Sequence, residues 1–146
     1  MGDGANSVNQ KTNGLTHRVL QPAGWRQPRG YANGVAARGR TIFTGGLIGW
    51  DAGGTFPSDF VGQVRQVLQN TVEVLAAGEA GPEHIVRMTW YVTDMDLYRN
   101  SLKDLGAAYQ DVMGRAYPAM ALVQVVRLVE PAALVEIETT AVVPES

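Results

Sequence analysis

The spacing of apolar residues in the middle of the chain predicts an amphipathic helix. Apolar residues recur there every three or four positions, as on the buried face of a helix, at Phe60, Val64, Val67, Leu68, Val72 and Leu75. Ser58 or Asp59 can cap the first turn and Gly78 fits the end, so this helix is expected to run to residue 77. A second helix is expected over roughly residues 97–113.

The segments around these helices have the composition of strands. A short extended piece is expected at 18–20, and longer strands at 31–37, 41–48, 85–93, 121–128 and 134–142. Arg38-Gly39-Arg40 predicts a tight hairpin between the first two long strands. Gly45-Gly46 indicates a close approach of the backbone by a neighbouring segment or a ligand.

The order of these elements predicts an α+β fold in which both helices cover one face of a mixed sheet. The strands carry more apolar residues than two helices can cover, among them Trp90, Val123, Val125, Val135 and Ile137. An exposed apolar patch in a soluble protein marks an interface. We therefore expect an oligomer.

Composition and charge narrow the class of protein. With 146 residues, 45% of them hydrophobic, the chain fits one domain with a single core. Its net charge of −2 favours neither nucleic acid nor a membrane surface as a partner. The absence of cysteine excludes disulfides and thiolate sites, and His17 and His84 match no metal-binding spacing.

The start of the chain differs in composition from the rest. It is rich in glycine, asparagine and polar residues and lacks the basic start and apolar stretch of a signal peptide. We expect a flexible tail over residues 1–16 and a single domain over 17–146. No apolar run reaches the roughly 20 residues that span a bilayer, and nothing directs export, so a cytoplasmic location is expected.

Several short motifs follow one another in an order that resembles the Rid/YjgF family, also called the endoribonuclease L-PSP-like family. They are Pro-x-Gly-Tyr at 28–31, Phe-Thr-Gly-Gly at 43–46, Ala-Ala-Gly at 76–78, Val-Arg-Met-Thr-Trp-Tyr-Val-Thr-Asp at 86–94, Tyr-Pro-Ala-Met-Ala-Leu-Val-Gln-Val at 117–125 and Leu-Val-Glu-Ile-Glu-Thr-Thr-Ala at 134–141. No single motif is decisive, but their shared order over residues 18–144 is specific.

The resemblance implies a chorismate-mutase-like fold that forms a homotrimer, with a central β-barrel and the helices outside. It also implies small-molecule clefts between neighbouring subunits. Members of the family hydrolyse reactive enamines and imines, such as 2-aminoacrylate, to keto acids and ammonia, and they need no cofactor.

The same resemblance singles out two positions for chemistry. It places an arginine that grips the substrate carboxylate directly after Pro118-Ala119, where this chain has Met120. Methionine offers a soft apolar surface and cannot form the bidentate bonds of a guanidinium. Glu136 matches a glutamate that positions the attacking water, and Glu138 follows on the same strand face. This pair can support acid–base work or make structural hydrogen bonds at a subunit junction.

The substrate-binding positions that the resemblance implies are Tyr31, Thr44, Gly45, Gly46, Gly106, Met120 and Leu122. Alternatively, Tyr31 is a structural aromatic residue that packs at the start of a strand. The alignment of Gly106 with the family's position requires a gap, because the segments differ in length. A site with these residues prefers a bulkier and less charged ligand than 2-aminoacrylate. Trp25 and Trp90 are better explained as core or interface residues. Four cationic residues could supply the positive charge of the missing arginine: Arg26, Arg29, Lys103 and Arg115. Most cationic side chains on a protein surface have no such role.

Three functions remain to be weighed. The first is hydrolytic deamination of an enamine or imine other than 2-aminoacrylate, for example an intermediate of amino-aromatic catabolism. The second is a non-catalytic, metabolite-binding or regulatory trimer. The third, ribonuclease activity, fits badly because the chain is acidic and has no catalytic histidine pair.

Overall fold

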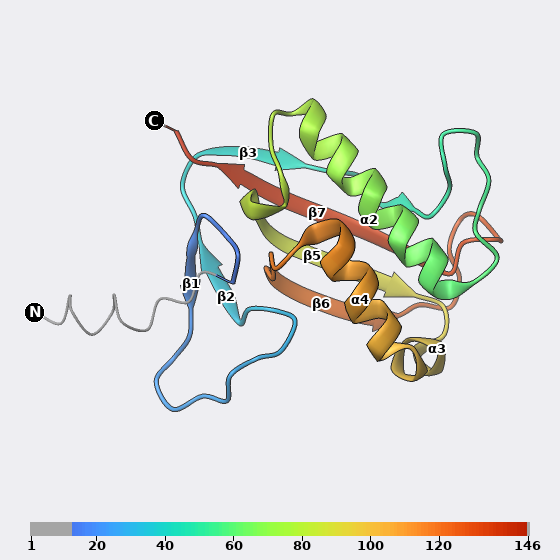
Figure 1. Cartoon of the computed structure of the whole chain (residues 1–146), viewed down its shortest axis with the longest axis horizontal. Coiled ribbons are helices and arrows are strands. Elements are labelled where there is room, and N and C mark those ends of the chain that lie inside the picture. Colours follow the sequence, from blue (N-terminus) through green and yellow to red (C-terminus); the bar gives the residue numbers. More distant parts are fainter. Residues whose placement is uncertain (1–12, 146) are drawn as a thin grey trace, which may run out of the picture.

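Residues 13–145 of the computed structural model form two β-sheets with helices packed on one side (Figure 1). A small antiparallel sheet joins β1 (Arg18–Leu20) to β2 (Gly34–Ala36). The main sheet has the order β3-β7-β5-β6, with β4 also paired to β7. Only β5 and β6 pair in parallel within it. Its strands are β3 (Arg40–Phe43), β4 (Leu47–Ile48), β5 (Ile85–Val92), β6 (Ala119–Gln124) and β7 (Val135–Val143).

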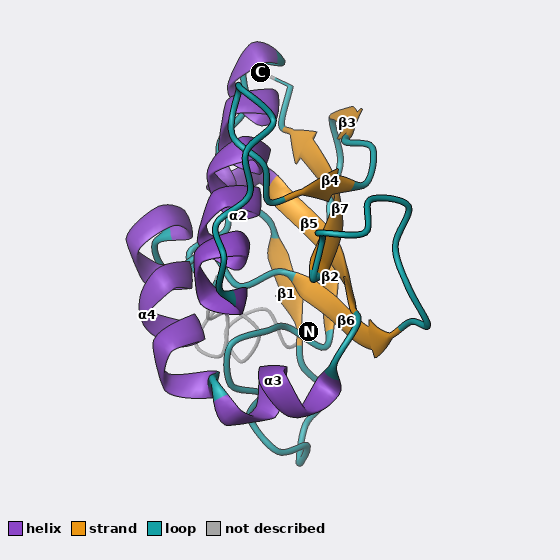
Figure 2. Cartoon of the chain, turned by 90° about the vertical axis from the view of Figure 1, so that its right-hand side faces the viewer, coloured by secondary structure: helices purple, strands orange, loops and turns teal. Residues whose placement is uncertain are grey.

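The helices of the described residues are α2 (Phe60–Ala77), the 3₁₀ helix η1 (Pro82–His84), α3 (Met95–Asn100) and α4 (Leu102–Met113). The carboxylate of Asp59 caps α2 by accepting a hydrogen bond of 2.9 Å from the backbone N–H of Gly62. α2 and α4 pack together on one face of the main sheet (Figure 2). The predicted α+β class is therefore confirmed.

The hydrophobic core fills the space between the helices and this covered face of the sheet. Fully buried side chains there include Leu68 of α2, Met88 of β5 and Ile137 of β7. Buried and more exposed residues alternate along β7, because successive side chains of a strand point to opposite faces. The main sheet thus has one covered face and one open face.

The open face is more polar than the sequence led us to expect. Trp90, Val135 and Ile137 all lie in the core on the covered face. The alternate residues of the strands, which point the other way, include Thr89, Tyr91, Glu136, Glu138 and Thr140, with Phe43 and Val123 as exposed apolar exceptions. The prediction of an exposed apolar sheet face is wrong, because the alternation in β5 and β7 places the apolar side chains on the covered face. The oligomer stays a prediction that this argument no longer supports.

A hairpin, a strand and a helix differ from the predicted ones. The hairpin expected at 38–40 is wrong, because β2 pairs with β1 whereas β3 pairs with β7. The strand expected at 41–48 is interrupted where the Thr44 hydroxyl accepts a hydrogen bond of 3.0 Å from the N–H of Thr139. The expected second helix is two helices, since Ser101 leaves helical geometry with φ −114° and ψ 12°.

Residues 13–16 belong to the predicted flexible tail, but they contact the folded domain. The N–H of Thr16 donates to the carbonyl of Glu83 at 2.9 Å, and Leu15 is buried. The rest of the predicted tail, residues 1–12, lies outside the described residues. Within the described range, no helix combines the length and apolar character that crossing a membrane requires.

Candidate functional site

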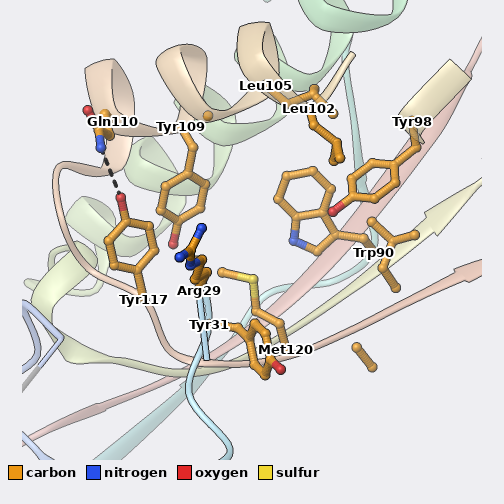
Figure 3. A pocket seen from close by; sticks show the side chains of 14 residues that line it. Arg29, Tyr31, Trp90, Tyr98, Leu102, Leu105, Tyr109, Gln110, Tyr117 and Met120 are labelled. Carbon is orange, nitrogen blue, oxygen red and sulfur yellow. Dashed lines mark hydrogen bonds between the residues drawn. The ribbon is translucent and has the colours of Figure 1, made fainter. Parts of the chain in front are cut away.

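A cavity of about 370 Å³ lies at the edge of the main sheet, between β5 and β6 on one side and α3 and α4 on the other. The loop that precedes β2 closes one end of it (Figure 3). The residues that line it are Arg29, Gly30, Tyr31, Trp90, Tyr98, Leu102, Leu105, Gly106, Tyr109, Gln110, Tyr117, Met120, Ala121 and Leu122. Four of the predicted site residues are therefore brought together here.

The register of the strands explains why Met120 and Leu122 face this cavity. Met120 pairs with Met88, and Leu122 pairs with Trp90, in the parallel ladder between β5 and β6. Met88 and Trp90 point into the core beneath the helices, so their partners on β6 point to the same side. Because β6 is the edge strand, its side chains extend past the helices and form the floor of the cavity.

Gly106 widens the cavity from the side of α4. A Cβ atom at this position would meet nothing within 4 Å, so the space beside the glycine is open. Gly106 is part of the cavity lining, and its role as a ligand-binding position stays a prediction. A larger side chain here would occupy the cavity itself.

Aromatic side chains form the wall of the cavity. Tyr109 and Tyr117 stack with their ring centroids 5.3 Å apart and their planes 15° apart. The Tyr109 hydroxyl donates a hydrogen bond to the carbonyl of Ala116, and Gln110 donates to the Tyr117 hydroxyl at 3.3 Å. Burial raises the pKa of Tyr98 and of Tyr109, so both phenols are neutral at physiological pH.

Most of this aromatic wall was not predicted from the sequence. Leu102 and Tyr109 lie four residues before and three residues after Gly106, and this spacing places all three on one face of a helix. That spacing is the signal that could have identified them. Trp90 was expected to be a core or interface residue; it is buried in the core and lines the cavity as well.

Asn13 fixes the two segments that carry Tyr31 and Tyr117. Its side-chain amide donates to the carbonyl of Tyr31 at 3.4 Å and to the carbonyl of Tyr117 at 3.3 Å. The N–H of Tyr117 donates in turn to the carbonyl of Asn13 at 2.8 Å. Residue 13 thus connects two sides of the cavity that are far apart in sequence.

The other predicted site residues lie on the open face of the sheet. Glu136 pairs with Tyr91 in β5 and with Ile48 in β4. Its carboxylate fills the space beside Gly46, where an added Cβ would lie only 2.8 Å from the Glu136 Cδ. Gly45 precedes this contact, and the Thr44 hydroxyl is bound to the backbone of β7. Glu136, Thr44, Gly45 and Gly46 therefore form a second group, which is not part of the cavity.

Glu138 continues this second group along β7. Its carboxylate accepts a hydrogen bond of 2.6 Å from the hydroxyl of Tyr91. This hydrogen bond is the main cause of a raised pKa for Tyr91. The bond lies within one chain, so both the acid–base role of Glu138 and its role at a subunit junction stay predictions.

Several other candidate residues lie away from both groups. Arg26, Lys103 and Arg115 do not line the cavity, whereas Arg29 does. His17 and His84 both bond to the backbone: His17 Nε2 lies 2.7 Å from the carbonyl of Val142, and His84 Nδ1 accepts from the N–H of Gly81 at 3.0 Å. Within residues 13–145 no group of three or more metal-ligating side chains could hold an ion.

Comparisons with known proteins show which proteins this chain is similar to in sequence and fold. The family model described as Endoribonuclease L-PSP matches residues 26–143. The RutC family protein PH0854 from Pyrococcus horikoshii is 31% identical over 113 residues, which cover 76% of this chain and 85% of the relative. The crystal structure of the Rid-family protein YyfB from Yersinia pestis has a TM-score of 0.78 at 30% identity and covers 88% of this chain and 100% of its own. TdcF from E. coli, solved with bound serine, has a TM-score of 0.63 at 28% identity, over 87% and 99% of the two chains.

The structure is that of a small α+β protein with a cavity at the edge of a mixed sheet. The chain belongs to the endoribonuclease L-PSP family, the Rid/YjgF family that its motifs resemble.

Proposed function

We propose that this Rid/YjgF protein binds a small, mainly apolar metabolite with an aromatic or conjugated body in the cavity above β6. The observation that carries the proposal is the meeting of Gly106, Met120 and Leu122 in one cavity with five aromatic side chains. Flat aromatic walls and a methionine floor favour a planar apolar molecule through burial and ring stacking.

The chemistry of the cavity supports binding more directly than catalysis within one chain. Among residues 13–145, neither a carboxylate nor a histidine lines it. Its buried phenols have raised pKa values, so they do not act as bases near neutral pH. Met120 stands where the resemblance places a carboxylate-gripping arginine, which argues against 2-aminoacrylate as the ligand.

A second candidate is hydrolytic deamination of a larger enamine or imine in a homotrimer. It needs Glu136 of a neighbouring subunit to position water, because Glu136 of the same chain lies on the other face of the sheet. Two observations favour it. β6 is the edge strand of the main sheet beside the cavity, and beyond the bridge between Ala119 and Ala32 its outer edge has no strand partner among the described residues. This edge is a natural place for another chain to pack, and Val123 on this strand is exposed. The similar protein TdcF from E. coli was solved with bound serine, so one protein of this fold holds a small amino acid.

RNA cleavage finds no support in the described residues. Both histidines are engaged with the backbone, and the net charge is −2. Arg29 is the one arginine of the described residues that lines this cavity, which is too little positive charge to bind a phosphate backbone.

The test compares binding and turnover in the same preparation. Calorimetric titration with naphthalene derivatives measures binding, and ammonia release from 2-aminoacrylate and from an aminomuconate-type substrate measures deamination. The proposal predicts binding of the aromatic compounds and no acceleration with 2-aminoacrylate. Ammonia release from the larger substrate that Glu136→Gln abolishes, and that the surface variant Glu73→Gln keeps, would establish the second candidate. The binding proposal is wrong if no aromatic compound binds.

A further inference from the structure

We infer that the ligand is an aromatic carboxylate whose carboxylate is held by Arg29, with its ring system against Trp90. This inference rests on the proposed binding function and adds the charge and the orientation of the ligand. The anion-binding group is then on the loop before β2, and the apolar part of the ligand packs against Met120 on the floor of the cavity.

Arg29 provides the charge. It is the one charged side chain in the cavity lining of the described chain. In Figure 3 its side chain projects into the cavity, in the same part of the view as Tyr109, Tyr117 and Met120. Neither a hydrogen bond nor an ion pair joins its guanidinium to any of residues 13–145, and no lining carboxylate neutralises it. A guanidinium with its donors unused binds a carboxylate through two parallel hydrogen bonds.

Trp90 provides a second, independent observation. The residue is only 5% exposed, and its Nε1 is one of two buried side-chain atoms in the described chain without a hydrogen-bond partner. The indole lines the cavity, with its nitrogen turned in Figure 3 toward the region of Met120. Buried indole N–H groups ordinarily have a partner, so an acceptor on a bound molecule would satisfy this one.

The hydrogen-bond chemistry of the cavity points the same way. Arg29 and Trp90 can only donate hydrogen bonds. The Tyr109 hydroxyl already donates to Ala116, and the Tyr117 hydroxyl accepts from Gln110. Arg29 and Trp90 offer donors only, and the hydroxyls of Tyr31 and Tyr98 can donate as well as accept, so the cavity suits a ligand rich in acceptors. The carboxylate is the acceptor that matches the planar fork of arginine.

The placement of these groups fixes how the ligand lies. Its carboxylate meets Arg29 at the exposed end, where Arg29 remains accessible to solvent. Its rings extend over Met120 toward Trp90, Tyr98 and Leu102 at the other end, so the acceptor for the Trp90 N–H is a polar substituent on the far ring, such as a hydroxyl or carbonyl oxygen (Figure 3). A small carboxylate can occupy only the arginine end, so an extended aromatic acid gains the most buried apolar surface.

The test uses two ligands of nearly equal shape and two matched variants of the full chain. The ligands are 2-naphthoate and the neutral 2-naphthamide, and their dissociation constants are measured by calorimetry. Arg29→Gln removes the proposed anchor. Arg26→Gln is the control, since Arg26 is exposed in the same loop and does not line the cavity. A second measurement follows the indole N–H signals in a ¹H–¹⁵N spectrum, with Trp90 assigned from Trp90→Phe.

We expect Arg29→Gln to weaken naphthoate binding at least about tenfold, as loss of a charge-assisted pair does, and to leave naphthamide binding nearly unchanged. Arg26→Gln should change neither. The Trp90 signal should move on addition of naphthoate, whereas that of Trp50, which is not in the cavity, should not. The inference is overturned if wild-type protein binds both compounds equally well, or if Arg29→Gln weakens both alike. If neither compound binds, the proposed function fails with it.

Discussion

Met120 and Glu136 lie on opposite faces of the same sheet. Met120 pairs with Met88 and points under the helices, whereas Glu136 pairs with Tyr91 and points to the open face. β5 lies between their strands. The two positions that the family resemblance assigns to one reaction therefore cannot act on one ligand within a single chain. They can do so only if a neighbouring chain supplies one of them.

Replacement of Met120 by arginine should reverse the ligand preference of the cavity. A guanidinium on the floor would take the space of the apolar body and offer a carboxylate a second anchor. We expect Met120→Arg to weaken binding of a neutral naphthalene about tenfold and to strengthen binding of a small aliphatic carboxylate such as pyruvate. Calorimetric titration measures both. Unchanged affinities for the two ligands would show that Met120 does not face the ligand.

Two substitutions of Gly106 should have separate effects, one on the stability of the fold and one on ligand binding. Gly106→Ala places a Cβ in open space and should stabilise the helix by about 0.5–1 kcal/mol, because glycine is costly inside a helix. Gly106→Phe should instead fill the cavity and abolish aromatic binding. Urea unfolding monitors the first effect and calorimetry the second. If the phenylalanine variant binds as well as wild type, the ligand lies elsewhere.

The contact between Gly46 and Glu136 predicts a coupling on the open face. Gly46→Ala forces the Glu136 side chain to move and should lower the free energy of unfolding by about 1 kcal/mol. Gly45→Ala is a matched control, because a Cβ there meets nothing within 4 Å. In a Glu136→Ala background the cost of Gly46→Ala should largely disappear, which a double-mutant cycle measures. Purely additive effects would contradict the contact.

The buried Tyr109 predicts a loss of stability at high pH. Burial raises the pKa of its phenol in the folded state, so the folded chain retains this proton while the unfolded chain loses it above about pH 10. Its contribution is fully present below that pH and falls by roughly 1.4 kcal/mol per unit above it. The stability difference between wild type and Tyr109→Phe should therefore shrink between pH 10 and 11 in urea unfolding. A difference that does not depend on pH would be the opposite result.

The proposed trimer makes a prediction about the edge strand β6. Sedimentation equilibrium should give a mass of about three times the 15.7 kDa of the chain. Val123→Asp, on the exposed side of β6, should shift the protein toward the monomer. Val74→Asp is the matched control on the helical side, because Val74 is exposed on α2, and it should leave the oligomeric state unchanged. A monomeric wild-type protein would rule out a site shared between subunits.

The elements with a strong periodic pattern could be predicted from the sequence. α2 begins after the expected cap Asp59 and ends at Ala77, because its apolar spacing and its cap agree with its tertiary packing. β7 departs by one residue at each end from the expected range of 134–142. The site positions Gly106, Met120 and Leu122 were also expected to lie together, and they line one cavity.

The pairing of elements could not be predicted in the same way. The turn at 38–40 has the composition of a hairpin, but it carries the chain from one sheet to another, which only the long-range partner β7 decides. The division of the site residues between two faces depends on strand register, since a shift of one residue reverses the face of every side chain. The role of Tyr98 depends on how α3 folds beside the edge of the sheet, and no local spacing encodes this.

The most direct test of the account is the methyl spectrum of protein labelled with ¹³C-methyl methionine. The chain has five methionines. Of those in the described part of the chain, Met120 alone lines the cavity, and Met120→Leu assigns its signal. On titration with 2-naphthoate, the Met120 methyl signal should shift through ring-current effects, while that of Met113, buried in the core, should stay in place. Saturable binding that leaves the Met120 signal unmoved would contradict the proposed site.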